Sequence, residues 1–78
     1  AIYCNVHIYR ATGQRYQARI RSRGERKWTR IGHPSLSEKS AIMAASRVMM
    51  KARPGDRAEV IYWANYYDPN VLVEMVRR

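Results

Sequence analysis

The chain has 78 residues, a net charge of +9 at pH 7 and a mean hydropathy of -0.59. This length suits one domain with a small core, and no apolar run approaches the ~18 residues that a membrane-spanning helix needs. The single cysteine, Cys4, excludes an internal disulfide, and one cysteine with two histidines gives no zinc-ligand spacing. We therefore expect one basic domain over residues 1–78 that stays in the cytosol, with no membrane segment, metal or cofactor.

The N-terminal third predicts an antiparallel meander of three strands. Residues 3–10 and 15–23 each alternate apolar and polar side chains, as strands with one buried face do. A glycine-containing turn at 11–14 joins them, and a second tight turn leads into a short third strand over 27–32. The side chains expected on the core face are Cys4, Val6, Ile8, Tyr16, Ala18, Ile20 and Ile31.

Residues 34–52 change to a helical period. Ser35, followed three positions later by Glu38, fits a capping box and predicts the start of a helix. The proline and glycine at 53–56 predict its end, because proline cannot continue a helix and glycine permits a sharp exit. The stripe expected to pack on the sheet consists of Leu36, Ala41, Ile42, Ala45, Val48, Met49 and Ala52.

The remaining residues predict a return to the sheet. Residues 57–67 are rich in β-branched and aromatic side chains, which favour a fourth strand. The Asp68-Pro69 pair fits either the start of a last helix or a turn into an edge strand, and three valines in the tail favour the strand. The expected fold is α+β in the order β-β-β-α-β-β: a three-stranded antiparallel meander, one main helix packed on one face, a fourth strand, and a C-terminal strand or short helix.

Positive charge is concentrated between Arg10 and Arg30, where eight of the fifteen basic residues meet one acid, Glu25. If the helix covers one side of the meander, the other side exposes arginines, aromatic rings and Gln17. Arginine pairs with phosphate through a planar fork and reads guanine bidentately, and exposed aromatic rings stack on bases. Alternatively, the arginine stems merely cover the aromatics of an ordinary polar sheet face. The predicted binding residues are Tyr9, Arg15, Arg19, Arg21, Arg23, Arg26, Lys27, Trp28 and Arg30.

A resemblance is carried by residues 13–49, GQRYQARIRSRGERKWTRIGHPSLSEKSAIMAASRVM. This segment has a glycine before an aromatic residue, an ARIR-type strand, a basic turn, an IG pair that closes the next strand, and an alanine-rich helix. In these features it resembles the DNA-binding domain of phage integrase arm-binding regions and plant ethylene-response factors. The resemblance implies that the sheet enters the major groove. Residues from Ala58 onward have no counterpart in that domain. The residues that the resemblance assigns to reading DNA are Arg15, Arg19, Arg21, Trp28 and Arg30.

Two further resemblances concern architecture. Three antiparallel strands, a helix and another strand are similar to the first half of the ribonuclease H fold and to the antitoxins that reuse it. That likeness implies no catalysis here, because Cys4, Asn5 and His7 stand where an aspartate is needed for a two-metal site. The length and the order of elements also resemble small anti-CRISPR proteins of phages, which implies an inhibitor that binds protein.

No constellation of residues predicts an enzyme. His7 and His33 are isolated, the six acids are scattered, and no glycine-rich phosphate loop or nucleophile motif occurs. On the helix, Met43, Arg47 and Met50 fall opposite the core stripe, where they either form an adaptable binding surface or widen the core.

Two functions are favoured, and a structural or assembly role is the remaining alternative. One is a non-catalytic module, encoded by a phage or mobile element, that binds nucleic acid through the arginine and aromatic face, with double-stranded DNA favoured and RNA left open. The other is a phage-encoded inhibitor of the anti-CRISPR type that binds an acidic surface of a host protein. Either acts in the host cytoplasm if a phage encodes it, and a homodimer formed through the fourth strand or the tail is also open.

Overall fold

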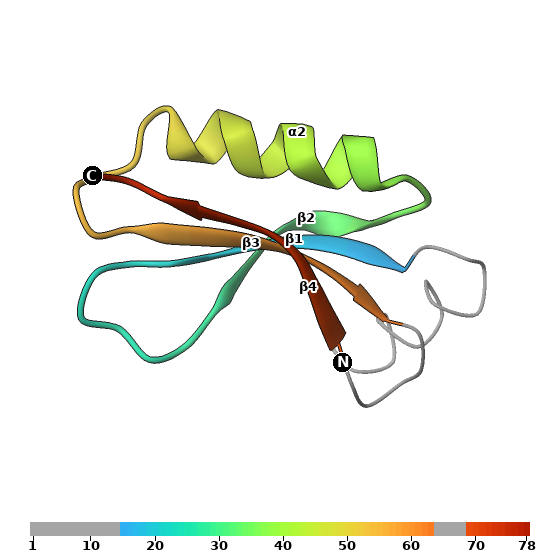
Figure 1. Cartoon of the computed structure of the whole chain (residues 1–78), viewed down its shortest axis with the longest axis horizontal. Helices are drawn as coiled ribbons and strands as arrows, with labels where there is room; N and C mark the ends of the chain where they lie inside the picture. The colour runs from blue at the N-terminus through green and yellow to red at the C-terminus, as the bar shows by residue number, and fades with distance from the viewer. Residues whose placement is uncertain (1–14, 64–68) are drawn as a thin grey trace.

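The structure, a computed structural model, describes residues 15–63 and 69–78 (Figure 1). It confirms an α+β fold in which an antiparallel sheet carries one helix on one face, and it makes the tail a strand. The expected first strand over 3–10 lies outside the described residues, as do 64–67 of the fourth. No helix in the described ranges is long and apolar enough to cross a membrane. The elements are β1 (Tyr16–Arg21), β2 (Thr29–Ser35), α2 (Glu38–Met49), β3 (Arg57–Trp63) and β4 (Pro69–Val76).

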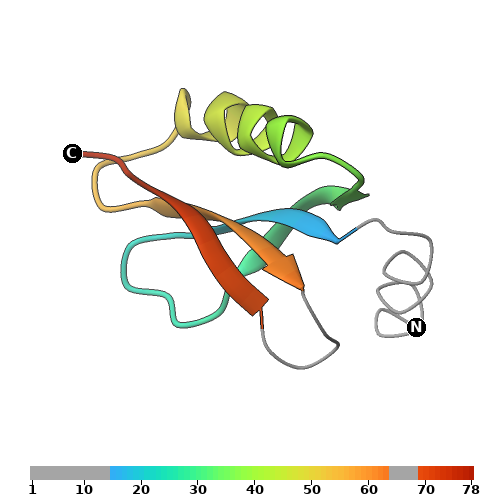
Figure 2. The same cartoon turned by 45° about the vertical axis from the view of Figure 1, so that its right-hand side comes forward.

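The strand order in the sheet is β2-β1-β3-β4, and each strand is antiparallel to its neighbour. β1 and β2 form a hairpin, α2 crosses over the sheet, and β3 then pairs with the free side of β1. Figure 2 shows the strands twisting beneath the helix. β1 and β3 are therefore the central strands of the described sheet, and β2 and β4 are its edges.

The core between α2 and the sheet is built largely from alanine. Ala41 and Ala45 of the helix are buried against the sheet, where Ala18 and Ala58 of the two central strands are also buried. Short side chains on both layers let the helix lie close to the strands, so little room remains for larger ones. A ring of half-buried side chains surrounds this centre: Tyr16, Ile20, Ile31, Ile42, Ala44, Ala52, Val73 and Met75.

The predicted start of the helix was wrong by two residues. Ser37 is the N-cap, and its Oγ accepts a hydrogen bond of 3.1 Å from the backbone N–H of Ser40. Ser35 still belongs to β2, and Glu38 is the first helical residue. Its negative charge there interacts favourably with the positive end of the helix dipole. Leu36 lies in the connection before the helix and is 66% exposed, so it does not join the core stripe.

β2 continues past its predicted end at residue 32 by means of a bulge. The register between β1 and β2 shifts around Gln17, which alone stands opposite residues 32–34. Gly32 has a φ of +68°, a left-handed conformation that glycine adopts without the strain of a Cβ. Pro34 lacks a backbone N–H, and it is tolerated here because β2 is an edge strand.

The prediction that Gln17 is exposed was also wrong, since its side chain is 1% exposed. The bulge leaves carbonyl groups of β2 without partners in the ladder. The Gln17 Nε2 donates to the carbonyl oxygens of Ile31 at 3.1 Å and Gly32 at 3.3 Å, and to that of Ala18 at 2.8 Å. Gln17 is therefore part of the fold rather than of a binding surface.

Candidate functional site

The sheet face that α2 leaves uncovered carries most of the charged strand residues. Directly paired residues on neighbouring strands point to the same face. The register places Arg30, Arg19, Glu59 and Glu74 in one row across β2, β1, β3 and β4. We name the open sheet face by the charged and aromatic residues that it carries: Arg15, Arg19, Arg21, Trp28, Arg30, Arg57, Glu59 and Glu74.

Arg19 is held by an acid on the neighbouring strand. Its Nε and Nη2 donate to Glu59 Oε1 at 2.9 and 2.6 Å, and the two side chains are 22% and 11% exposed. The sequence placed only Glu25 near the arginines, because Glu59 is 40 positions away from Arg19 in the chain. Arg19 therefore stabilises the sheet and is not a free cation.

Trp28 brings two guanidinium groups together on this face. The Cζ atom of Arg19 lies 4.7 Å from the centre of the indole ring, and that of Arg21 lies 4.8 Å from it. Both distances are within the range of cation–π attraction. The half-buried indole thus fixes two arginine side chains, a role that the sequence did not predict when it offered Trp28 as a platform for bases.

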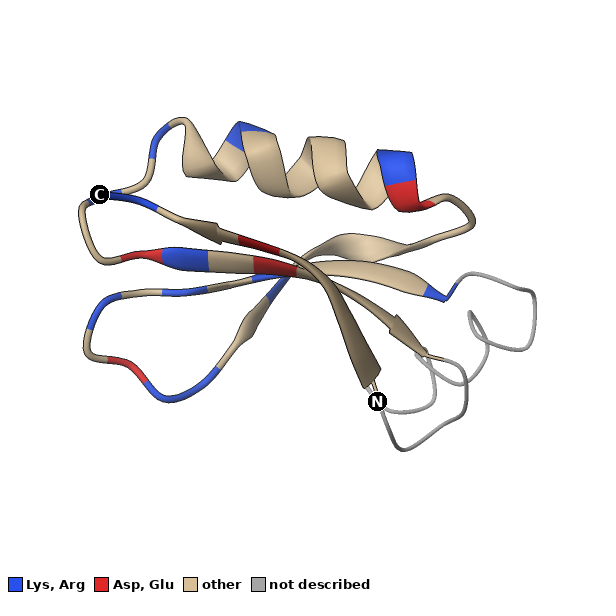
Figure 3. Cartoon of the chain, viewed as in Figure 1, with Lys and Arg blue, Asp and Glu red and all other residues tan. Residues whose placement is uncertain are grey.

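Next to Trp28 lies a small pocket of about 40 Å³, bordered by two cations and two acids. Arg21 stands directly opposite Arg57, and in the next row Glu59 stands directly opposite Glu74. Figure 3 shows the acidic positions on β3 and β4 and the cationic positions along the connection between β1 and β2. An anionic ligand is therefore attracted to the β2 side of the open sheet face and repelled from the β4 side.

The connection between β1 and β2 spans residues 22–28, and residues 22–27 of it are exposed. Arg26 and Lys27 extend from it into solvent. Arg23 turns elsewhere: its backbone N–H donates to Asp56 Oδ1 at 3.1 Å, and its side chain packs so closely on Gly55 that an added Cβ would lie 2.6 Å from Arg23 Cδ. Of the three cations predicted in this loop, the structure thus directs one toward the connection between α2 and β3.

Asp56 fixes the base of this loop. Its Oδ1 and Oδ2 accept from the backbone N–H groups of Arg23 at 3.1 Å and Arg53 at 3.0 Å. The hydrogen bonds from Arg53 and then Arg23 lower the pKa of the carboxyl group below its ordinary value of 3.8, since they favour the charged form. The Asp56 carbonyl also accepts from the N–H of Arg77 at 2.9 Å. One residue thereby ties together both loops and the end of β4.

The far end of the uncovered face is not available for binding. Gln17 is buried there, and Ile61 and Trp63 are only 2% and 7% exposed. Arg15, whose carbonyl accepts from the Trp63 N–H at 3.1 Å, is exposed at this end. Tyr9 lies outside the described residues. The remaining cations of this face and its loop are therefore the half-buried Arg19 and Arg21 and the exposed Arg26, Lys27, Arg30 and Arg57.

Sequence reasoning missed Arg57, Glu59 and Glu74, which share the face with the predicted residues. A signal existed for the first two: in the strand over 57–63, Arg57 and Glu59 alternate with Ala58 and Val60, which face the core. What the sequence lacked was the strand order that sets Glu59 beside Arg19.

Within residues 15–63 and 69–78, no group of three or more histidine, cysteine, aspartate or glutamate side chains lies close enough to hold a metal ion. Comparisons of the chain with protein-family models, with curated proteins and with solved structures found no significant match.

Proposed function

We propose that this protein is a small, non-catalytic module that binds nucleic acid, with double-stranded DNA as the favoured partner. The observation that carries the proposal is the Trp28 indole, which holds Arg21 and Arg19 at the base of an exposed cationic loop. Arginines that are already fixed lose less conformational entropy when they bind a phosphate or a base edge.

The shape of the β1–β2 hairpin favours duplex DNA over duplex RNA. Figure 1 shows the connection between these strands extending beyond the sheet on the side away from α2. The major groove of B-form DNA is about 12 Å wide and admits a two-stranded ribbon, whereas that of A-form RNA is too narrow and deep. The hairpin enters the groove loop first in this proposal.

Each cation then has a different role. Arg26, Lys27 and the exposed Arg30 contact phosphates, and Arg21 reaches the edges of bases. Arg19 acts as a positioning residue, because its guanidinium is already bonded to Glu59. The acids on β3 and β4 keep the phosphate backbone on the β2 side of the open sheet face.

Fluorescence anisotropy with random double-stranded DNA and single-stranded RNA, at about 50 and 200 mM salt, tests this function. We expect tighter binding to the duplex and a steep loss of affinity with salt. Arg26→Gln and Lys27→Gln should each lower the affinity and reduce the slope of log K against log salt by about 0.9. Lys39→Gln is the matched control, since it removes the same charge from an exposed site in the first turn of α2.

Unchanged affinity in both hairpin variants would contradict the proposal. An equal loss of affinity in Lys39→Gln would mean that nucleic acid is attracted only by the net charge of the protein, and not by this hairpin.

The mixed charge of the row across the sheet supports a second candidate, an inhibitor that binds an acidic surface of a host protein. Arginine and tryptophan are typical anchors of protein interfaces, and the exposed carboxylate of Glu74 suits a cation that a protein carries and a nucleic acid lacks. Two results together would favour this function. The chain would show negligible binding to nucleic acid at the lower salt, and it would capture a host protein from nuclease-treated lysate in a way that is lost when Trp28 is replaced. An origin in a phage or mobile element stays a prediction.

A further inference from the structure

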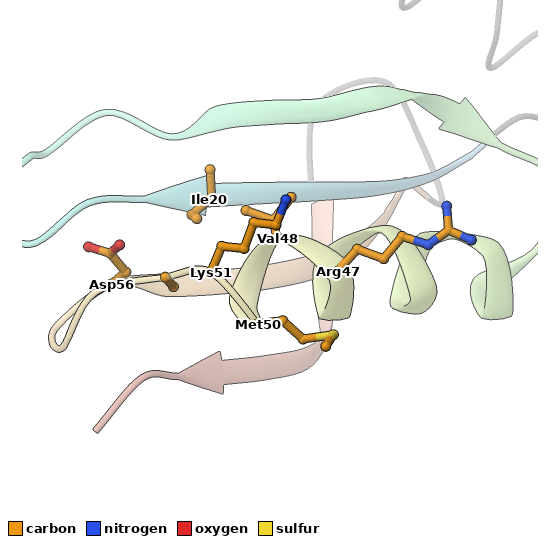
Figure 4. A pocket seen from close by; sticks show the side chains of 7 residues that line it. Ile20, Arg47, Val48, Met50, Lys51 and Asp56 are labelled. Carbon is orange, nitrogen blue, oxygen red and sulfur yellow. The ribbon is translucent and has the colours of Figure 1, made fainter.

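A second recessed surface lies on the helix layer, away from the open sheet face. The C-terminal part of α2 and strand β1 border a groove of about 710 Å³, seen from close by in Figure 4. Its apolar part is formed by the half-buried Ile20, Val48 and Ala52. The full lining consists of Ile20, Arg47, Val48, Met50, Lys51, Ala52 and Asp56.

Two unpaired cations border the apolar part of the groove. Arg47 and Lys51 are exposed and four positions apart, and neither side chain forms an ion pair or a hydrogen bond within residues 15–63 and 69–78. Like charges at this spacing repel each other by about 0.2–0.5 kcal/mol. Asp56, the acid in the lining, already accepts backbone hydrogen bonds from Arg23 and Arg53 with its two oxygens. The groove therefore attracts negative charge.

The exposed side of the helix extends this surface with methionine. Met43 and Met50 are 46% and 77% exposed, and the intervening Arg47 is also exposed, which confirms the prediction that all three lie opposite the core stripe. Methionine side chains are flexible and polarizable, so they adapt to the shape of an apolar partner. An apolar patch rimmed by cations is typical of a docking site rather than of an ordinary solvent-exposed helix face.

We propose that this groove binds an acidic peptide segment of a partner protein. Carboxylates of the segment pair with Arg47 and Lys51, and an aliphatic side chain between them packs on Ile20 and Val48. A nucleic acid fits the groove less well, because its backbone offers no apolar group and no aromatic side chain in the lining can stack on a base. The open sheet face is the face of the sheet that α2 leaves uncovered, whereas the groove lies on the side that carries α2. The two surfaces can therefore be occupied together.

The test begins with selection of short random peptides, displayed on phage, against the full chain. We expect selected peptides with acidic residues on either side of a leucine, isoleucine or methionine. Measured by fluorescence anisotropy with the synthetic peptides, the double variant Arg47→Glu/Lys51→Glu should weaken binding by about tenfold or more. Its matched control is Lys39→Glu/Arg78→Glu, which makes the same change in net charge at exposed sites outside the groove and should keep the affinity.

Circular dichroism of all variants separates a loss of binding from a loss of fold. Selected peptides without acidic residues, selection of no common pattern, or equal binding to the Arg47→Glu/Lys51→Glu variant would overturn the proposal. It would also be overturned if that variant lost affinity for double-stranded DNA as much as for the peptides, because the groove would then be part of a nucleic-acid surface.

Discussion

At the scale of single residues, Arg19 and Glu59 decide how the open sheet face is to be tested. Replacing Arg19 with methionine keeps much of the stem but leaves the Glu59 carboxylate, 11% exposed, without its hydrogen-bond donors. We expect the free energy of unfolding to fall by about 1–3 kcal/mol, the cost of an unsatisfied buried group or of a lost hydrogen bond to a charge. Urea unfolding followed by circular dichroism measures this difference.

The double variant Arg19→Met/Glu59→Met is the control, since it removes both members of the pair. It should regain most of the lost stability because no charge is left buried alone. If instead the loss of stability in the double variant equals the sum of the losses in Arg19→Met and Glu59→Met, the two side chains have no coupling energy. In either case Arg21→Gln is the cleaner probe of binding on this face.

The orientation of a side chain was predictable from the sequence where it depends only on the residue's position in its own strand. Alternation correctly set Ala18 and Ile20 toward the core and Arg19 and Arg21 away from it. It failed for Gln17, because burial of this side chain depends on a bulge in the neighbouring strand. The ion pair of Arg19 was likewise hidden, since no local pattern states which strand becomes its neighbour.

At the scale of elements, the start of α2 gives a direct test of the corrected cap. Ser37→Ala removes the side chain that accepts from the Ser40 N–H, and we expect the free energy of unfolding to fall by about 1 kcal/mol. Ser35→Ala is the matched control, because the one hydrogen bond that Ser35 Oγ forms within the described residues is an exposed one, donated to the carbonyl of Ser37 at 3.0 Å. A larger loss in Ser35→Ala than in Ser37→Ala, measured by thermal unfolding, would restore the capping box expected from the sequence.

For the elements within residues 15–63 and 69–78, the period of each segment predicted its type and its place in the order, but it did not predict where the element ends. The helix stripe and the alternating strands are long enough to carry a clear signal, and the three valines of the tail correctly favoured strand. The end of β2 was missed because Gly32 looked like a terminator, whereas it permits a bulge beyond which pairing resumes at Ser35.

At the scale of the whole molecule, two layers present positive charge in different chemical settings. The open sheet face and its loop combine arginines with an indole, and the groove on the helix layer combines cations with aliphatic side chains. The sequence revealed the first concentration of charge because it is continuous along the chain. It did not reveal the groove, since Ile20 and Lys51 meet only after α2 has folded back over β1.

The net charge of +9 makes opposite predictions for folding and for binding when salt is added. Repulsion among the cations opposes the compact state, so raising sodium chloride from about 50 to 200 mM should increase the free energy of unfolding in urea. Over the same range, the three phosphate contacts that we propose for Arg26, Lys27 and Arg30 predict that the affinity for double-stranded DNA falls by roughly 40-fold. If the free energy of unfolding fell together with the affinity, attractive pairs such as Arg19–Glu59 would outweigh the repulsion among the cations. The excess positive charge would then not destabilise the free protein, and an anionic partner would not stabilise it by neutralising that charge.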